Sequence, residues 1–117
     1  MTDTGLENFP SPIIRRLEGL LAAGQSSTVL HFSLGSAWLD HDSQRAAGHF
    51  RAALELDRSY SAAWKQLGKA VLAAGDRDGA SEAWSEGIAA AEARGDVQAG
   101  KEMKVFLRRI SSGAPAH

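Results

Sequence analysis

Histidines and acidic residues are the side chains of this sequence that could bind a metal ion or transfer protons. His41 lies between Asp40 and Asp42, and the chain has no cysteine that could serve as a thiolate ligand or nucleophile. Adjacent side chains point in different directions, and no further ligand follows one helical turn after His41. We therefore interpret this trio as a solvated turn.

Other candidate sites also lack the residues that their chemistry requires. Residues 75–79 resemble the start of a calcium loop, but the later ligands and the closing Glu are missing. His31 takes a packing position and is expected in the core, whereas His49 precedes Phe50 and is expected to face solvent. The sequence therefore predicts no catalytic residue, no metal site, no cofactor and no enzymatic activity.

Composition excludes further classes of function. The 117 residues are 44% apolar and 23% charged, as in a folded protein with one core, and the formal net charge of -1 gives no positive field for nucleic acid. The N-terminus has no secretory signal, and no apolar run approaches the roughly 20 residues that span a bilayer. We predict a cytoplasmic protein that binds neither nucleic acid nor membrane.

Helix signals follow one another along most of the chain. Ser11 and Pro12 suit a helix start, and Gly24 suits its left-handed end. In this first helix the apolar face is expected to carry Ile13, Leu17, Leu20 and Leu21, and the outward face Arg15, Arg16 and Glu18. Five more helices are predicted at about 27–40, 42–56, 60–74, 76–95 and 96–110. Residues 11–110 then form one all-α domain, with a disordered tail at 1–10 and a C-terminal tail at 111–117.

An internal repeat connects four of these helices. His31, Leu34, Gly35 and Trp38 recur 33 residues later as Trp64, Leu67, Gly68 and Val71. Ala46, Phe50, Ala53 and Leu54 recur 34 residues later as Ala80, Trp84, Gly87 and Ile88. Each copy places a small residue on one helix where the other helix carries an aromatic ring, so the two helices can pack closely. Trp64 and Trp84 are expected in the core, and the place of Trp38 is left open.

This pattern resembles the tetratricopeptide repeat, whose signature combines Trp, Leu-Gly, Ala and aromatic residues. His31 and Arg58 depart from the preferred Trp and Pro. The resemblance implies an α-solenoid of antiparallel helix hairpins, with the first and sixth helices as caps. In the sixth helix we expect Val97, Met103, Phe106 and Ile110 to cover the end of the stack, and Lys101, Lys104, Arg108 and Arg109 to meet solvent.

The resemblance also implies a peptide-binding groove along the first helix of each hairpin. The groove residues are expected to be Val29, Phe32, Ser36, Leu39, Ala62, Lys65, Lys69 and Leu72. Because residues 61–75 contain no acidic side chain that would offset the two lysines, the expected partner is a protein or peptide that is acidic or C-terminal, with an apolar anchor. We therefore predict an adaptor or scaffold of unassigned oligomeric state.

Three alternatives to the adaptor remain. The first is a structural or oligomerising subunit that associates through its exposed end helices. DNA binding would have to use residues 101–109, and the near-neutral charge counts against it. Catalysis would require a convergent group of polar residues that the sequence does not show.

Overall fold

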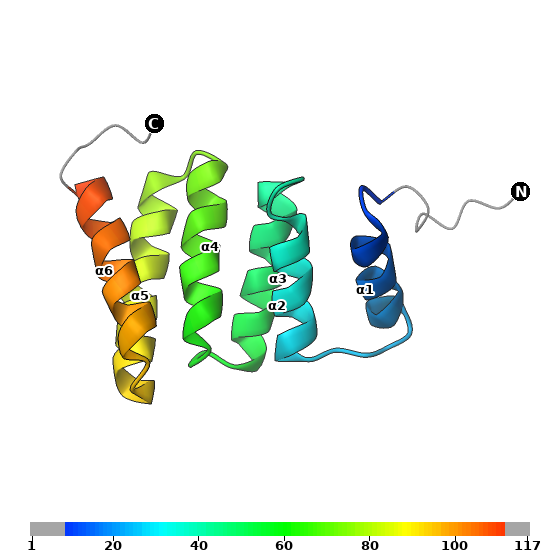
Figure 1. Cartoon of the computed structure of the whole chain (residues 1–117), viewed down its shortest axis with the longest axis horizontal. Coiled ribbons are helices and arrows are strands. Elements are labelled where there is room, and N and C mark those ends of the chain that lie inside the picture. Colours follow the sequence, from blue (N-terminus) through cyan, green and yellow to red (C-terminus); the bar gives the residue numbers. More distant parts are fainter. Residues whose placement is uncertain (1–8, 112–117) are drawn as a thin grey trace, which may run out of the picture.

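The structure is a computed structural model that describes residues 9–111, so residues 1–8 and 112–117 of the predicted tails lie outside it. Within the described residues there are six α-helices and no strand, which confirms the all-α prediction (Figure 1). The helices are α1 (Pro12–Ala22), α2 (Thr28–Trp38), α3 (Ser43–Leu56), α4 (Ser61–Ala73), α5 (Arg77–Arg94) and α6 (Val97–Ser111). None of them is long and apolar enough to cross a membrane.

Local capping explains where the helices begin and end. The Ser11 hydroxyl accepts a hydrogen bond from the backbone N–H of Ile14, and carboxylates cap α3, α5 and α6 in the same way. Gly24 and Gly75 follow α1 and α4 with φ of 91° and 95°, a left-handed conformation that residues with a Cβ rarely adopt. The predicted start at Ser11 and Pro12 and the predicted left-handed end at Gly24 are therefore confirmed.

The helices stack side by side in chain order into an elongated body of 54 × 31 × 18 Å (Figure 1). Helices α2 and α3 form one antiparallel hairpin, α4 and α5 form the next, and α6 packs on α5 and also touches α4. Alternation of small and large side chains across each hairpin makes this packing possible. The core of the stack includes Leu34, Phe50, Trp64, Trp84 and Met103.

Two glycines permit the close approach within the hairpins. A Cβ placed on Gly35 would lie 2.5 Å from the ring of Phe50, and a Cβ on Gly68 would overlap the indole of Trp84. Each aromatic ring thus occupies the space that the missing side chain leaves. The structure confirms the small-to-large pairing that the repeat predicted.

The end helix α1 is oriented differently from the prediction. Ile14 is fully buried, whereas Ile13 and Leu20 are 52% and 37% exposed. Glu18, expected to face solvent, accepts a hydrogen bond from Trp38 Nε1 at 2.9 Å and lies 3.5 Å from His49 Nε2. The expectations for Ile13, Leu20 and Glu18 were wrong because, among the described residues, α1 packs mainly on α2, so only the face with Ile14 and Glu18 turns toward the stack. Leu17 and Leu21 pack against the core, as predicted.

The C-terminal helix α6 is held at both of its ends. Ser61 Oγ donates to Asp96 Oδ2 at 2.7 Å, and Arg77 Nη2 donates to the carbonyl oxygen of Ile110 at 3.1 Å. Met103 is fully buried, as predicted. Val97, which was predicted to cover the end of the stack, is instead 65% exposed, because within the described residues no helix follows α6 to cover it.

Candidate protein-binding surface

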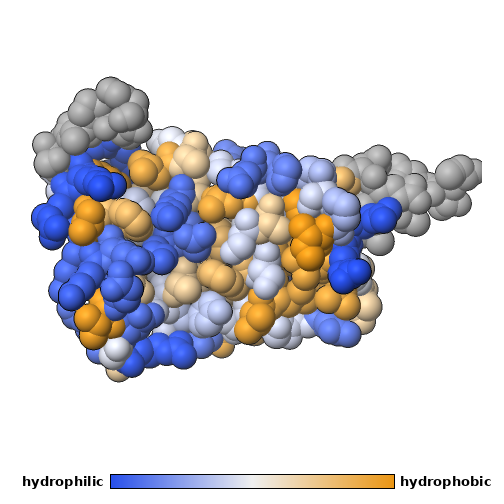
Figure 2. Space-filling view, viewed as in Figure 1, coloured by the Kyte–Doolittle hydropathy of each residue, from blue (hydrophilic) through white to orange (hydrophobic). Residues whose placement is uncertain are grey.

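The predicted groove residues follow one stripe along α2 and α4, the first helices of the two hairpins, and we call this set of eight the groove stripe. Val29 is 63% exposed, and Ser36 and Lys69 are also exposed. The other five are half-buried: Phe32, Leu39, Ala62, Lys65 and Leu72. Figure 2 shows apolar residues to be more frequent over α2 and α4, and hydrophilic residues over α6 at the left.

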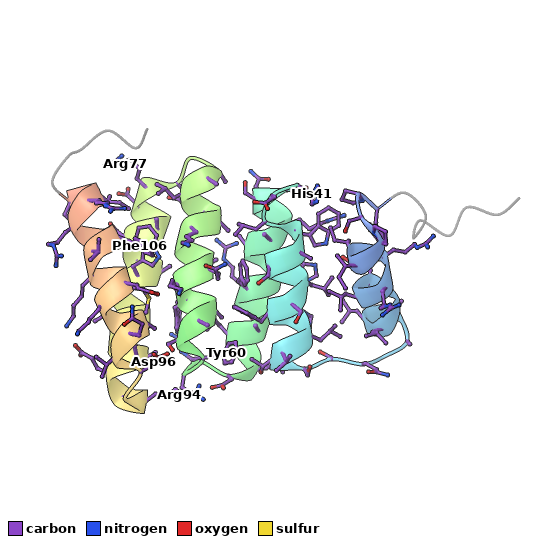
Figure 3. All side chains as sticks on the ribbon, in the orientation of Figure 1. His41, Tyr60, Arg77, Arg94, Asp96 and Phe106 are labelled. Carbon is purple, nitrogen blue, oxygen red and sulfur yellow. The ribbon has the colours of Figure 1, made fainter. Side chains whose placement is uncertain are left out.

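Aromatic rings form the α2 end of the groove stripe. The ring centroid of Phe32 lies 5.7 Å from that of Phe50 and 5.3 Å from that of Tyr60, with the Tyr60 ring edge-on at 83°. Figure 3 shows Tyr60 near the start of α4, where the two hairpins meet. Phe32 therefore joins the two hairpins, and it remains only half-buried.

The α4 end of the stripe carries an ion pair that the sequence did not reveal. Lys65 Nζ donates to Glu102 Oε1 of α6 at 2.6 Å, and this hydrogen bond is the main reason that the pKa of Glu102 is lowered from its ordinary value. Helix α4 carries no acidic residue that would offset the charge of its lysines. Glu102, which follows Lys65 by 37 residues in the sequence, offsets it from α6. The expectation of an uncompensated positive pair was therefore wrong.

Lys69 lies one helical turn beyond Lys65 and is more open. Its ammonium is 5.4 Å from the ring centroid of Phe106, which in turn packs 5.2 Å from Trp84. Phe106, labelled in Figure 3, comes from α6. Helix α6 thus adds Glu102 and Phe106 to the surface beside the groove stripe, and sequence periodicity within α4 could not have found either residue.

Two histidines, His31 and His49, lie together and are not part of the groove stripe. His31 and His49 stack with ring centroids 5.9 Å apart, and His31 Nε2 lies 3.1 Å from the Ser26 hydroxyl. Among the described residues, His31 Nδ1 is buried and has no hydrogen-bond partner. His49 was expected to face solvent but is mostly buried against Glu18, and burial lowers its pKa from the ordinary value of 6.5.

His41 lies at the surface of the stack, whereas the tryptophans lie in its core. His41 is exposed in the turn after α2, and residues 9–111 contain no group of three or more His, Cys, Asp or Glu side chains that could hold a metal ion. Trp64 and Trp84 are buried, as predicted, and Trp38 is buried as well. Their indole N–H groups donate to Glu18, to the Arg58 carbonyl and to the Lys65 carbonyl.

A concave surface lies between α3 and α5, away from the groove stripe. Its volume is about 410 Å³, and its floor is formed by Trp64, Leu67 and Val71 of α4. Arg58 on the α3 side reaches Glu86 on the α5 side, with 3.6 Å between Nη2 and Oε1. This surface is a competing place for a partner, and the experiment below distinguishes it from the groove stripe.

Comparisons with known proteins give consistent results for repeat type and fold. The chain is 50% identical over 99 residues to "TPR repeat-containing protein PA0015" of Pseudomonas aeruginosa, where TPR denotes the tetratricopeptide repeat, and the match covers 84% of this chain and 94% of that protein. No family model matches the chain.

Two solved structures are similar to this one. The solution structure of protein BPP2914 from Bordetella parapertussis has a TM-score of 0.77 and 47% identity, and covers 88% of this chain and 90% of that chain. The crystal structure of MamA has a TM-score of 0.63 and 23% identity, and covers 85% of this chain and 65% of that chain. At the lower identity the likeness is one of fold alone.

Proposed function

The chain belongs to the tetratricopeptide repeat family, and from this premise we propose that it is an adaptor or scaffold, without catalytic activity of its own, that binds a partner protein along the groove stripe. Repeats of this kind are general scaffolds for protein binding. The observation that carries the proposal is the open side of the stripe. Val29, Ser36 and Lys69 are exposed on the first helices, and Phe32 of the same stripe is only half-buried.

The chemistry of the stripe favours a segment with an apolar anchor and a carboxylate. The anchor would contact Val29 and Phe32, where the aromatic contact with Tyr60 holds the ring in place. The carboxylate, from an acidic residue or a C-terminus, would approach Lys69. Because Glu102 already neutralises Lys65, a partner carboxylate would compete with it for that lysine. Exposed ion pairs contribute only about 0–1 kcal/mol, so the anchor should supply most of the affinity.

Variants at the exposed stripe positions test the proposal. Once a partner has been captured from the native host and purified, its dissociation constant is measured by calorimetry for wild type, Val29→Glu and Lys69→Glu. We expect Val29→Glu to weaken binding at least tenfold, and Lys69→Glu to weaken it less and to reduce its dependence on salt. Phe32→Ala is avoided because it would also disturb the contact between the hairpins.

Two controls locate the partner. Leu56→Glu changes an equally open apolar residue, 55% exposed on α3, and should leave binding unchanged. Glu86→Lys changes the rim of the α3–α5 surface instead of the stripe. If Glu86→Lys abolishes binding while Val29→Glu and Lys69→Glu leave it intact, the partner docks between α3 and α5 and the groove assignment is wrong.

A further inference from the structure

The repeat register extends into α6, which has the pattern of a first helix. Ala99, Gly100 and Met103 follow Leu67, Gly68 and Val71 by 32 residues, and all six are buried. In the internal hairpins the glycine at this position meets an aromatic ring of the second helix. A Cβ on Gly100 would find only the Ala91 side chain, at 3.6 Å, because no second helix follows α6 within the described residues.

Helix α1 has the complementary pattern of a second helix. Ile13, Leu17 and Leu20 precede Ala46, Phe50 and Ala53 of α3 by 33 residues. In α3 all three are fully buried, because α2 covers them. In α1 the same face is only partly covered by the described residues, with Ile13 and Leu20 exposed and Leu17 half-buried at the edge of the core.

The two ends of the stack therefore expose opposite halves of the same interface. At the α6 end, Val97 is exposed beside a shallow hollow of about 320 Å³ that the last turn of α5, Gly100 and the lysines of α6 line. At the α1 end, Leu17 stands where Phe50 and Trp84 stand in the internal hairpins. The α6 end thus offers the small residue, Gly100, and the α1 end offers the large one, Leu17.

We propose that these ends bind each other between copies of the chain, so that α6 of one copy and α1 of the next form a hairpin in trans. Leu17 would enter the space beside Gly100, as Trp84 does beside Gly68. In the antiparallel arrangement of the internal hairpins, Leu20 would then lie near Val97. The contact joins two different surfaces, so it is heterologous and extends head to tail.

Charges near this contact set its dependence on salt. Arg15 and Arg16 are exposed on α1, and Lys101, Lys104 and Arg108 are exposed on α6, with Lys104 Nζ 3.4 Å from Glu92 Oε2. The surplus of positive charge on both helices opposes association, whereas burial of apolar side chains drives it. Association should therefore be weak at low ionic strength and tighter at high ionic strength, because salt screens the repulsion.

A pair of complementary variants tests the arrangement. Leu20→Lys disables the α1 face and leaves α6 intact, and Val97→Lys does the reverse. Sedimentation equilibrium of wild type, at loading concentrations from about 10 μM to about 1 mM, should show reversible growth beyond the dimer. Each variant alone should remain monomeric, whereas an equimolar mixture should form a 1:1 dimer, because one intact α1 face and one intact α6 face are then available.

The controls separate this contact from the groove stripe and from misfolding. Leu56→Lys should associate like wild type, and so should Val29→Glu and Lys69→Glu, which test partner binding. Circular dichroism should show that both end variants are folded. A monomeric wild type at all concentrations would overturn the proposal, and so would a mixture that stays monomeric while wild type associates, since that result indicates a contact between like faces.

Discussion

Glycines in the interior of the stack and glycines near its ends occupy equivalent helical positions in different surroundings. Gly68 lies against the indole of Trp84, and Gly35 lies against Phe50. Gly100 has the same place in the repeat but has no aromatic ring beside it. The comparison shows that the repeat signature describes a contact between two helices, so one helix can keep the pattern when its partner is absent. The first predictions test this difference.

The largest effect is expected at Gly68. Gly68→Leu places a side chain in the space of the Trp84 ring, and overpacking of this kind costs about 1–3 kcal/mol or more of unfolding free energy. Urea melts measure it, and Gly68→Ala should lose stability in the same direction. If either variant is as stable as wild type, the ring of Trp84 can move aside and the hairpin contact is not tight.

Gly100 should respond in the opposite direction. Gly100→Ala meets only an ordinary contact with Ala91, and replacing glycine within a helix stabilises by up to about 1 kcal/mol. Gly48→Ala on α3, where a Cβ meets nothing within 4 Å, is the matched control. Melts are run at low protein concentration. If Gly100→Ala loses stability and Gly48→Ala does not, Gly100 is packed as tightly as the interior glycines, and the proposed difference between the interior and the end of the stack is wrong.

Sequence reasoning predicted the helices well because their determinants are local. Caps such as Ser11 and Asp76, and left-handed stops such as Gly75, act within one turn of chain. The hairpin contacts were also predictable, since the repeat presents each pairing twice. Periodicity therefore sufficed for the fold, including the close approach at Gly35.

The ends of the stack and the charge of the groove stripe were not predictable in the same way. Which face of α1 is buried depends on its having one neighbour, and an apolar pattern alone did not distinguish Ile13 from Ile14. The partner of Lys65 is Glu102, which no spacing within one helix relates to it. Both features arise from contacts between distant segments, so the groove stripe remains a proposal.

The contact between α1 and the first hairpin provides the smallest predicted effect, which depends on pH. His49 is a residue of α3 whose ring reaches Glu18 of α1, and His31 and Arg45 also act on it. Burial is the largest cause of its lowered pKa, followed by an opposing attraction from Glu18. The folded protein therefore binds a proton at His49 less readily than the unfolded chain, whose histidine pKa is near 6.5.

It follows that neutral His49 stabilises the fold above pH 6.5, and that this contribution is lost as the pH falls through 6.5 toward the lowered pKa of the folded state. Melting temperatures at about pH 7.5 and about pH 5.5 should show a modest loss for wild type and a smaller one for His49→Gln. The carboxyls of Asp57 and Asp96 do not contribute in this window, because their pKa values lie below the ordinary 3.8. If the two proteins lose stability equally, titration of His49 does not weaken the contact between α1 and the first hairpin. In that case the stability of the α1 end of the stack would be no more sensitive to acid than that of the interior.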